Sequence, residues 1–218
     1  MNKQIKVVSA KNERHQFLEE DLLGLDKIYR LNLINSCTGY KSANLIGTQS
    51  KKGQTNLAVF SSITHLGSNP ALLGFILRPT TVPRHTHNNL KETGFFSVNS
   101  IVMDQIEEAH HTSAKYPENH SEFDQTHLEP EYISPWEIPF VKGAPIQIVC
   151  QYQNEYHIKE NDTILVVGKI KGLYVAKTLL LDDGWIQLDK GNIAAINGLD
   201  GYAEPNLRDR FPYARPKQ

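Results

Sequence analysis

SANLIGTQSKKGQTNLAVFSS (residues 42–62) contains two apolar runs joined by the polar turn Lys51-Lys52-Gly53-Gln54. NPALLGFILRP (69–79) and TTVPRHTHNNLKETGFFSVNS (80–100) follow it. Short runs of Leu, Ile, Val and Phe that end at Gly, Pro or Asn are typical of strands joined by turns. We therefore expect strands over 42–50, 55–63, 71–77 and 95–101, and a helix over 86–93 that is closed by Gly94.

The rest of the chain continues this pattern of strands with a few helices. Apolar spacing predicts helices over 15–31, with Gly24 as a break, and over 102–115, and a helical turn at 121–123. Alternating residues predict strands over 145–158 and 163–176 and a short one at 185–186. The sequence thus predicts a mainly β fold with peripheral helices, in a closed or partly closed barrel. We expect one domain over 1–218, with an N-terminal helical extension (1–30), a helical and loop insertion (102–144) and an irregular tail (198–218) that packs on the protein.

Composition excludes several classes of protein. The 218 residues carry a formal net charge of −1, which gives no electrostatic reason to expect binding to nucleic acid or to an anionic membrane. No window approaches the roughly 18 consecutive apolar residues of a membrane span. Residues 1–16 lack the apolar core and cleavage site of a signal peptide. Cys37 and Cys150 lie beside apolar segments, so we expect two buried free thiols and a cytoplasmic protein.

Two polar clusters, Asn56–Ser62 and Arg78–Asn89, lie among these strands. Adjacent serines at the end of a strand offer hydroxyls and amides, although they are also common at a solvated strand end. Arg84 precedes a helix that Thr86 can cap, and a helix N-terminus binds anions. Arg78 and Arg84 can add charge-assisted hydrogen bonds to a phosphate, although surface arginines beside an ordinary helix cap explain them too. Together these groups suit a planar cofactor that carries a phosphate.

The order and spacing of these residues resemble the flavin reductase-like, FMN-binding split-barrel family, whose small members include flavoredoxin. The resemblance extends over nearly the whole chain from about residue 30. It is carried by Gly53–Asn56, Ser61-Ser62, Pro70, Arg84–Leu90, Thr93–Asn99, Ala109–Tyr116, Ser121-Glu122-Phe123, Gly168 and Gly198–Tyr202.

The resemblance implies a homodimer of six-stranded Greek-key split barrels that each bind FMN non-covalently near the subunit interface. By position, Gly47, Thr48 and Asn56 would line the isoalloxazine. Ser61 and Ser62 would reach the ribityl chain and the phosphate, and Arg84 and Thr86 would hold the phosphate. The implied reaction is transfer of hydride from NAD(P)H to the flavin, which passes electrons to a flavin or protein acceptor.

One position departs from the family pattern. Many reductases of the family have Gly-Asp-His where this chain has Asn161-Asp162-Thr163, and that histidine lies near the nicotinamide in several of them. The departure leaves three hypotheses open: an NAD(P)H:flavin reductase, an FMN-carrying electron-transfer protein without a nicotinamide site, and a non-redox binding protein that has lost the cofactor.

Metal and hydrolase sites find little support in the sequence. His110, His111, His120 and His127 have no metal-binding spacing, and we expect a polar lid or a dimer-facing segment there instead. Ser61, His65 and Asp104 lack the G-x-S-x-G context of a hydrolase, and we expect His65 in a turn.

Overall fold

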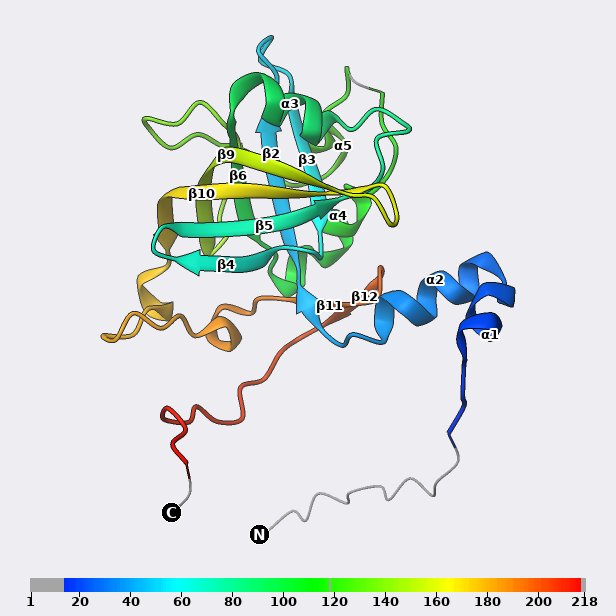
Figure 1. Ribbon diagram of the computed structural model, residues 1–218. Coiled ribbons are helices and arrows are strands. Elements are labelled where there is room, and N and C mark those ends of the chain that lie inside the picture. The colour runs from blue at the N-terminus through cyan, green and yellow to red at the C-terminus, as the bar shows by residue number, and fades with distance from the viewer. Residues whose placement is uncertain (1–13, 118, 217–218) are drawn as a thin grey trace.

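The computed structural model describes residues 14–117 and 119–216, and it is mainly β with peripheral helices, as the sequence predicts (Figure 1). The expectation of no signal peptide rests largely on residues 1–13, which lie outside these ranges. The helices are α1 (Glu19–Gly24), α2 (Lys27–Ser36), α3 (His85–Thr93), α4 (Ile106–His111) and α5 (Glu122–Gln125), with short 3₁₀ turns at Met103–Gln105, Lys177–Leu179 and Leu188–Gly191. The strands are β1 (Lys41–Ser42), β2 (Asn44–Gln49), β3 (Thr55–Phe60), β4 (Thr64–Ser68), β5 (Ala71–Leu77), β6 (Phe95–Ser100), β7 (Pro130–Glu131), β8 (Phe140–Val141), β9 (Ile146–Ile158), β10 (Thr163–Val175), β11 (Ala195–Asn197) and β12 (Gly201–Ala203).

The main sheet runs in the order β3–β2–β6–β9–β10–β5–β4, with every neighbouring pair antiparallel. It has seven strands, one more than expected, because Thr64–Ser68 pairs with β5. His65 therefore lies in a strand, and the prediction of a turn at this residue was wrong. The edge strands β3 and β4 are consecutive in the chain but do not pair, which leaves the barrel split.

A serine side chain bridges the sheet where the ladder is missing. Ser62 follows β3, and its hydroxyl accepts the Ile76 N–H (3.0 Å) and lies 3.3 Å from the Ile76 carbonyl oxygen. The pair continues the β4–β5 register, in which Thr64 lies opposite Gly74, towards the end of β3. A hydroxyl thereby joins the residues after β3 to β5, beyond the end of the β4–β5 ladder.

Alternation along the strands separates two apolar cores. Ile46, Phe75 and Phe96 pack inside the barrel, whereas Leu45 and Leu57 face outward against α4, α5 and β11. α3 lies across one end of the barrel, and Leu90 on its inner side joins the interior core (Figure 1). The helix therefore closes this end over β2 and β3.

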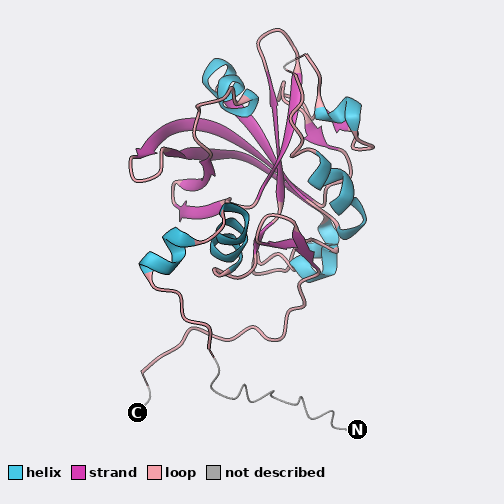
Figure 2. Ribbon diagram, turned by 90° about the vertical axis from the view of Figure 1, so that its right-hand side faces the viewer, coloured by secondary structure: helices cyan, strands magenta, loops and turns pink. Residues whose placement is uncertain are grey.

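α1, α2 and the tail up to residue 216 lie at the end of the barrel opposite α3 (Figures 1 and 2). The predicted break at Gly24 is confirmed, but the second helix continues to Ser36, and neither α1 nor α2 has a buried residue. Cys37 ends this segment and is exposed, so only Cys150 is a buried thiol as expected. The tail contacts the protein through Arg210, whose guanidinium lies 2.6 Å from Asp183 and over the ring of Trp185. Within residues 14–117 and 119–216, no helix has the length and apolar character needed to cross a membrane.

Other local predictions were partly right. Gly94 does close α3, with a positive φ and an N–H that donates to Leu90. The segment expected to be helical over 102–115 is a 3₁₀ turn followed by the six-residue α4, and the expected strand at 185–186 is a single bridge between Leu180 and Ile186.

Candidate functional site

Four polar side chains meet at the end of the barrel that α3 covers. Asn56 Nδ2 donates to Thr86 Oγ1 (3.1 Å) and to Thr48 Oγ1 (3.4 Å), and Asn89 Nδ2 donates to Thr48 Oγ1 (3.1 Å). All four side chains are buried. We call them the α3 cluster. It brings together three residues predicted from the sequence, namely Thr48, Asn56 and Thr86.

The α3 cluster also contains Asn89, which the sequence prediction missed. Asn89 lies three residues after Thr86, so both side chains project from one side of the helix. This i, i+3 spacing is the signal that could have identified it.

Two acceptor atoms in the α3 cluster are left for a ligand. Within the described ranges, no donor reaches the side-chain oxygen of Asn56 or of Asn89, and neither oxygen is sealed from solvent. Buried amides normally satisfy both their donor and their acceptor atoms. The two oxygens can therefore accept N–H or O–H groups of a bound molecule.

The N-terminus of α3 lies beside this cluster. The first hydrogen bond of the helix joins Asn88 N–H to Arg84 O, so the N–H groups of residues 85–87 have no acceptor within the helix. The helix begins at His85 with Arg84 as its N-cap and without a side-chain cap, so the prediction that Thr86 caps it was wrong. Arg84 Nε and Nη2 both donate to Pro79 O at 3.3 Å. This contact fixes the guanidinium of the N-cap residue against the loop that leads into α3.

Ser61, Ser62 and Gly47 lie outside the α3 cluster. The Ser62 hydroxyl is already bound to the backbone of Ile76, and Ser61 is half-buried next to it at the end of β3. Gly47 faces the opposite side of β2 from Thr48. A Cβ atom there would lie 2.4 Å from Pro139 O, so the glycine serves a close backbone contact.

α5 covers the first half of the free edge of β3. Glu122 Oε2 accepts the Leu57 N–H (2.8 Å), and the Ser121 and Thr55 hydroxyls are 2.7 Å apart. Burial raises the pKa of Glu122, although the hydrogen bond from Leu57 opposes the shift. The local sequence predicts no role for this carboxyl, because nothing in its pattern distinguishes it from a surface glutamate.

The four clustered histidines do not converge. His110 packs edge-on against Tyr202, and His127 pairs with Glu108 at 2.8 Å. His111 bonds to Tyr116 and His120 to its neighbour Asn119. Across the described residues, no group of three or more His, Cys, Asp or Glu side chains is arranged to hold a metal ion.

Thr163, which stands where many reductases of the family have a histidine, lies at the tip of the β9–β10 hairpin. Thr163 pairs with Ile158 and Ile164 with His157, on the facing strand. His157 Nε2 is 3.6 Å from Asp162 Oδ1. The hairpin tip thus keeps an imidazole, although on the other strand.

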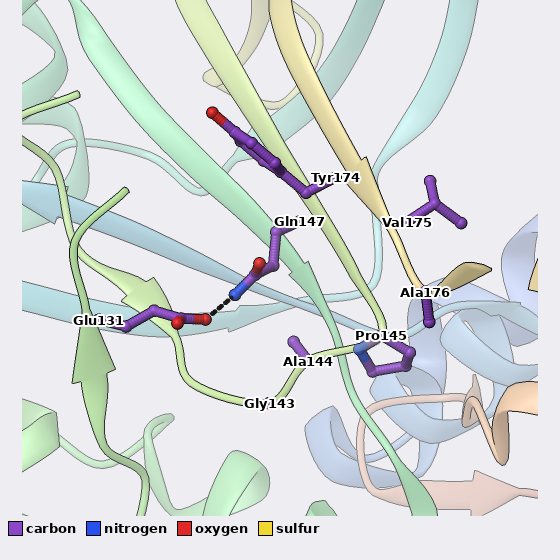
Figure 3. Close-up of a pocket in the computed structure, with 8 residues that line it drawn as sticks. All are labelled: Glu131, Gly143, Ala144, Pro145, Gln147, Tyr174, Val175 and Ala176. Atoms are coloured by element: carbon purple, nitrogen blue, oxygen red, sulfur yellow. Dashed lines mark hydrogen bonds between the residues drawn. The ribbon is translucent and has the colours of Figure 1, made fainter. Parts of the chain in front are cut away.

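Two cavities lie away from the α3 cluster. One, of about 440 Å³, is open to solvent and lined by Glu131 and Gln147, which are hydrogen-bonded, and by Tyr174 and the turn into β9 (Figure 3). The other, of about 500 Å³, is mostly apolar and lies at the barrel end opposite α3, among residues such as Val98. Neither of these two cavities is lined by a predicted site residue.

Known proteins match both the sequence and the fold. The chain is 41% identical to a proposed flavin reductase with a split barrel domain from Shewanella frigidimarina, with a TM-score of 0.89 over 92% of this chain and 100% of that chain. Nitrilotriacetate monooxygenase component B from Bacillus cereus is 20% identical, with a TM-score of 0.80 over 92% and 100% of the chains. Flavoredoxin of Desulfovibrio vulgaris is 18% identical, with a TM-score of 0.69 over 80% and 92%. The last two likenesses show the fold alone.

The sequence profile of the flavin reductase like domain matches residues 40–185, which contain the main sheet and the α3 cluster. This match covers more than half of the chain. The protein therefore belongs to the flavin reductase-like domain family, with a split-barrel fold.

Proposed function

We propose that the chain binds FMN beside β3 and the N-terminus of α3. The observation that carries this proposal is the α3 cluster, which joins Asn56 on the strand to Thr86 on the helix and leaves the solvent-accessible side-chain oxygens of Asn56 and Asn89 without a donor in the described ranges. The residues fit the cofactor chemically. Open N–H groups and Arg84 suit a phosphate, and the amide oxygens suit the N–H and O–H donors of a flavin.

The other predicted contacts remain part of this proposal. Ser61 is the better of the two serines for binding the ribityl chain or the phosphate, because the Ser62 hydroxyl is already hydrogen-bonded to the backbone of Ile76. Thr48 would support the isoalloxazine side through Asn56. Gly47 would contribute only backbone atoms to the FMN site, because a Cβ on this residue would point at the Pro139 carbonyl oxygen.

We further propose that the protein is an NAD(P)H:flavin oxidoreductase. Bound FMN would accept the hydride, while the protein would bind and orient the FMN. Membership of the flavin reductase-like family supports this activity. The alternative, an FMN-carrying electron-transfer protein served by a partner protein, is favoured by Thr163 in place of the family histidine. His157, which lies on the strand that faces Thr163 in the hairpin, supports the reductase hypothesis.

We also propose that the working unit is a homodimer in the cytoplasm. α1 and α2 expose apolar side chains such as Leu23 and Ile28, and the tail exposes Phe211 (80%) and Tyr213 (91%). Patches of this kind mark protein interfaces in soluble proteins. A second copy would cover them. The unpaired Cys37 and Cys150 suit a reducing compartment.

Flavin titration followed by anaerobic reduction tests these proposals in order. We expect quenching of FMN fluorescence on binding and release of FMN on denaturation. A protein that does not take up FMN would contradict both flavin functions. NADH and NADPH are then mixed anaerobically with the FMN-loaded protein. Bleaching at enzymatic rates is expected for the reductase, whereas no bleaching with either donor would support the electron carrier.

A further inference from the structure

β3 is an edge strand, but half of its free edge is covered. In its pairing with β2, alternate residues direct their N–H groups away from the partner strand. Leu57 is one of these residues, and its N–H is bound by Glu122. An outward N–H on an edge strand is ordinarily hydrogen-bonded to water. β3 differs from an ordinary edge strand because a protein carboxyl accepts its N–H at Leu57.

The two contacts from α5 flank one residue of the candidate site. Thr55 meets Ser121 through its hydroxyl, and Leu57 meets Glu122 through its amide. Between them lies Asn56, whose side chain points to the other side of the strand and holds Thr86 and Thr48. α5 therefore fixes the backbone on both sides of the residue that links β3 to α3.

Glu122 is well placed to hold this backbone firmly. Its side chain is buried and it follows Ser121, the N-cap of α5, whose own hydroxyl accepts the Phe123 N–H. A carboxylate that accepts a backbone N–H makes a stronger hydrogen bond than a neutral acceptor. Its fixed position at a helix start leaves it little freedom to move.

We propose that Glu122 is a positioning residue of the candidate cofactor site, which holds β3 at Leu57 so that Asn56 stays in the α3 cluster. The proposal rests on the proposed function only in taking FMN as the ligand. Glu122 acts through the strand and does not itself touch the ligand.

Three variants separate the hydrogen bond from the charge. Glu122→Ala removes the acceptor, Glu122→Gln keeps an acceptor oxygen and the shape, and Glu129→Gln changes an exposed carboxylate that pairs with Lys142. Amide hydrogen exchange of residues 55–60 is measured without flavin, and FMN affinity is measured by fluorescence quenching. We expect Glu122→Ala to speed exchange at Leu57 and to weaken FMN binding, each by on the order of tenfold or more. Glu122→Gln should restore most of both, and Glu129→Gln should change neither.

The two measurements keep this proposal apart from the proposed function. Faster exchange in Glu122→Ala with unchanged FMN affinity would overturn the positioning role, and so would unchanged exchange at Leu57. If the wild-type protein takes up no FMN, the proposed function fails, and the exchange data still decide whether Glu122 holds β3. If Glu122→Ala does not fold, Thr55→Val loosens the same edge at its other contact. It should weaken FMN binding by about threefold, and unchanged affinity would contradict the proposal.

Discussion

The side-chain amide of Asn56 donates a hydrogen bond to the hydroxyl of Thr86, 3.1 Å away and 30 residues further along the chain. This contact ties edge strand β3 to the first turn of α3. It therefore links the two elements on which the proposed site depends.

We expect the Asn56–Thr86 pair to be coupled. Asn56→Ala leaves the buried Thr86 hydroxyl without its donor, whereas Thr48 keeps Asn89, and it should lower the free energy of unfolding by about 1–3 kcal/mol. Thr86→Val removes the other partner, so the double variant should lose less than the sum of the single losses, by about 0.5 kcal/mol or more. Urea unfolding of the four proteins measures this coupling. Asn88→Ala, at an exposed position on the same helix, is the control, and strictly additive losses would show that the contact contributes nothing.

Arg84→Ala tests where the phosphate binds. A charge-assisted hydrogen bond is worth roughly 1.5–3 kcal/mol, so FMN affinity should fall by more than about tenfold. Riboflavin lacks the phosphate, and its affinity should change much less. Arg208→Ala removes the same charge from the exposed tail and should affect neither flavin. An equal loss for FMN and riboflavin in Arg84→Ala would mean that the phosphate binds elsewhere.

The exposed face of α2 tests the homodimer. Ile28→Glu places a charge among apolar side chains that a second copy would bury, and should weaken dimerisation at least tenfold. Asn32→Glu adds the same charge at a polar exposed position and should be milder. Light scattering over a concentration series reports both. A dimer as tight in Ile28→Glu as in the wild type would place the interface away from α2.

The buried carboxyl of Glu122 predicts a pH dependence of stability. Burial raises its pKa, so the folded state holds a proton that the unfolded state releases above about pH 4.3. The free energy of unfolding should therefore fall as pH rises from that value through the raised pKa. Glu122→Gln should flatten this part of the profile, and its stability relative to wild type should rise with pH.

Glu129 is the matched control for this pH profile. The Lys142 ammonium holds the pKa of Glu129 below its ordinary value, so its contribution has the opposite sign and is lost as pH falls. Glu129→Gln should not flatten the profile above pH 4.3. If Glu122→Gln and the wild-type protein have parallel profiles, the carboxyl titrates as an exposed one does.

The sequence predicted the barrel because its strands are short apolar runs bounded by turn residues, such as the hairpin at Gly53. It missed β4, because the exposed run around His65 carries no apolar alternation and becomes a strand only by pairing with β5. Cys37 was wrongly expected to be buried, since α2 carries apolar side chains but none of its residues is buried by the described part of the chain.

Only part of the candidate site could be predicted from the sequence. The family resemblance assigned Thr48, Asn56 and Thr86 to one cofactor site, and in the structure the Asn56 amide joins the two hydroxyls. Their role toward a cofactor stays a prediction. Two contacts were missed. Ser62 bonds to Ile76, 14 positions away, and Glu122 accepts the N–H of Leu57 in β3, 65 positions away. Contacts at such separations follow from the folded topology, which no local pattern reports.

A crystal structure of the protein soaked with FMN would show where the cofactor binds. We expect the phosphate at the N-terminus of α3 beside Arg84, with the flavin against β3 and within hydrogen-bond reach of an amide oxygen of the α3 cluster. Flavin bound in either of the two separate cavities, or a phosphate remote from Arg84, would contradict it.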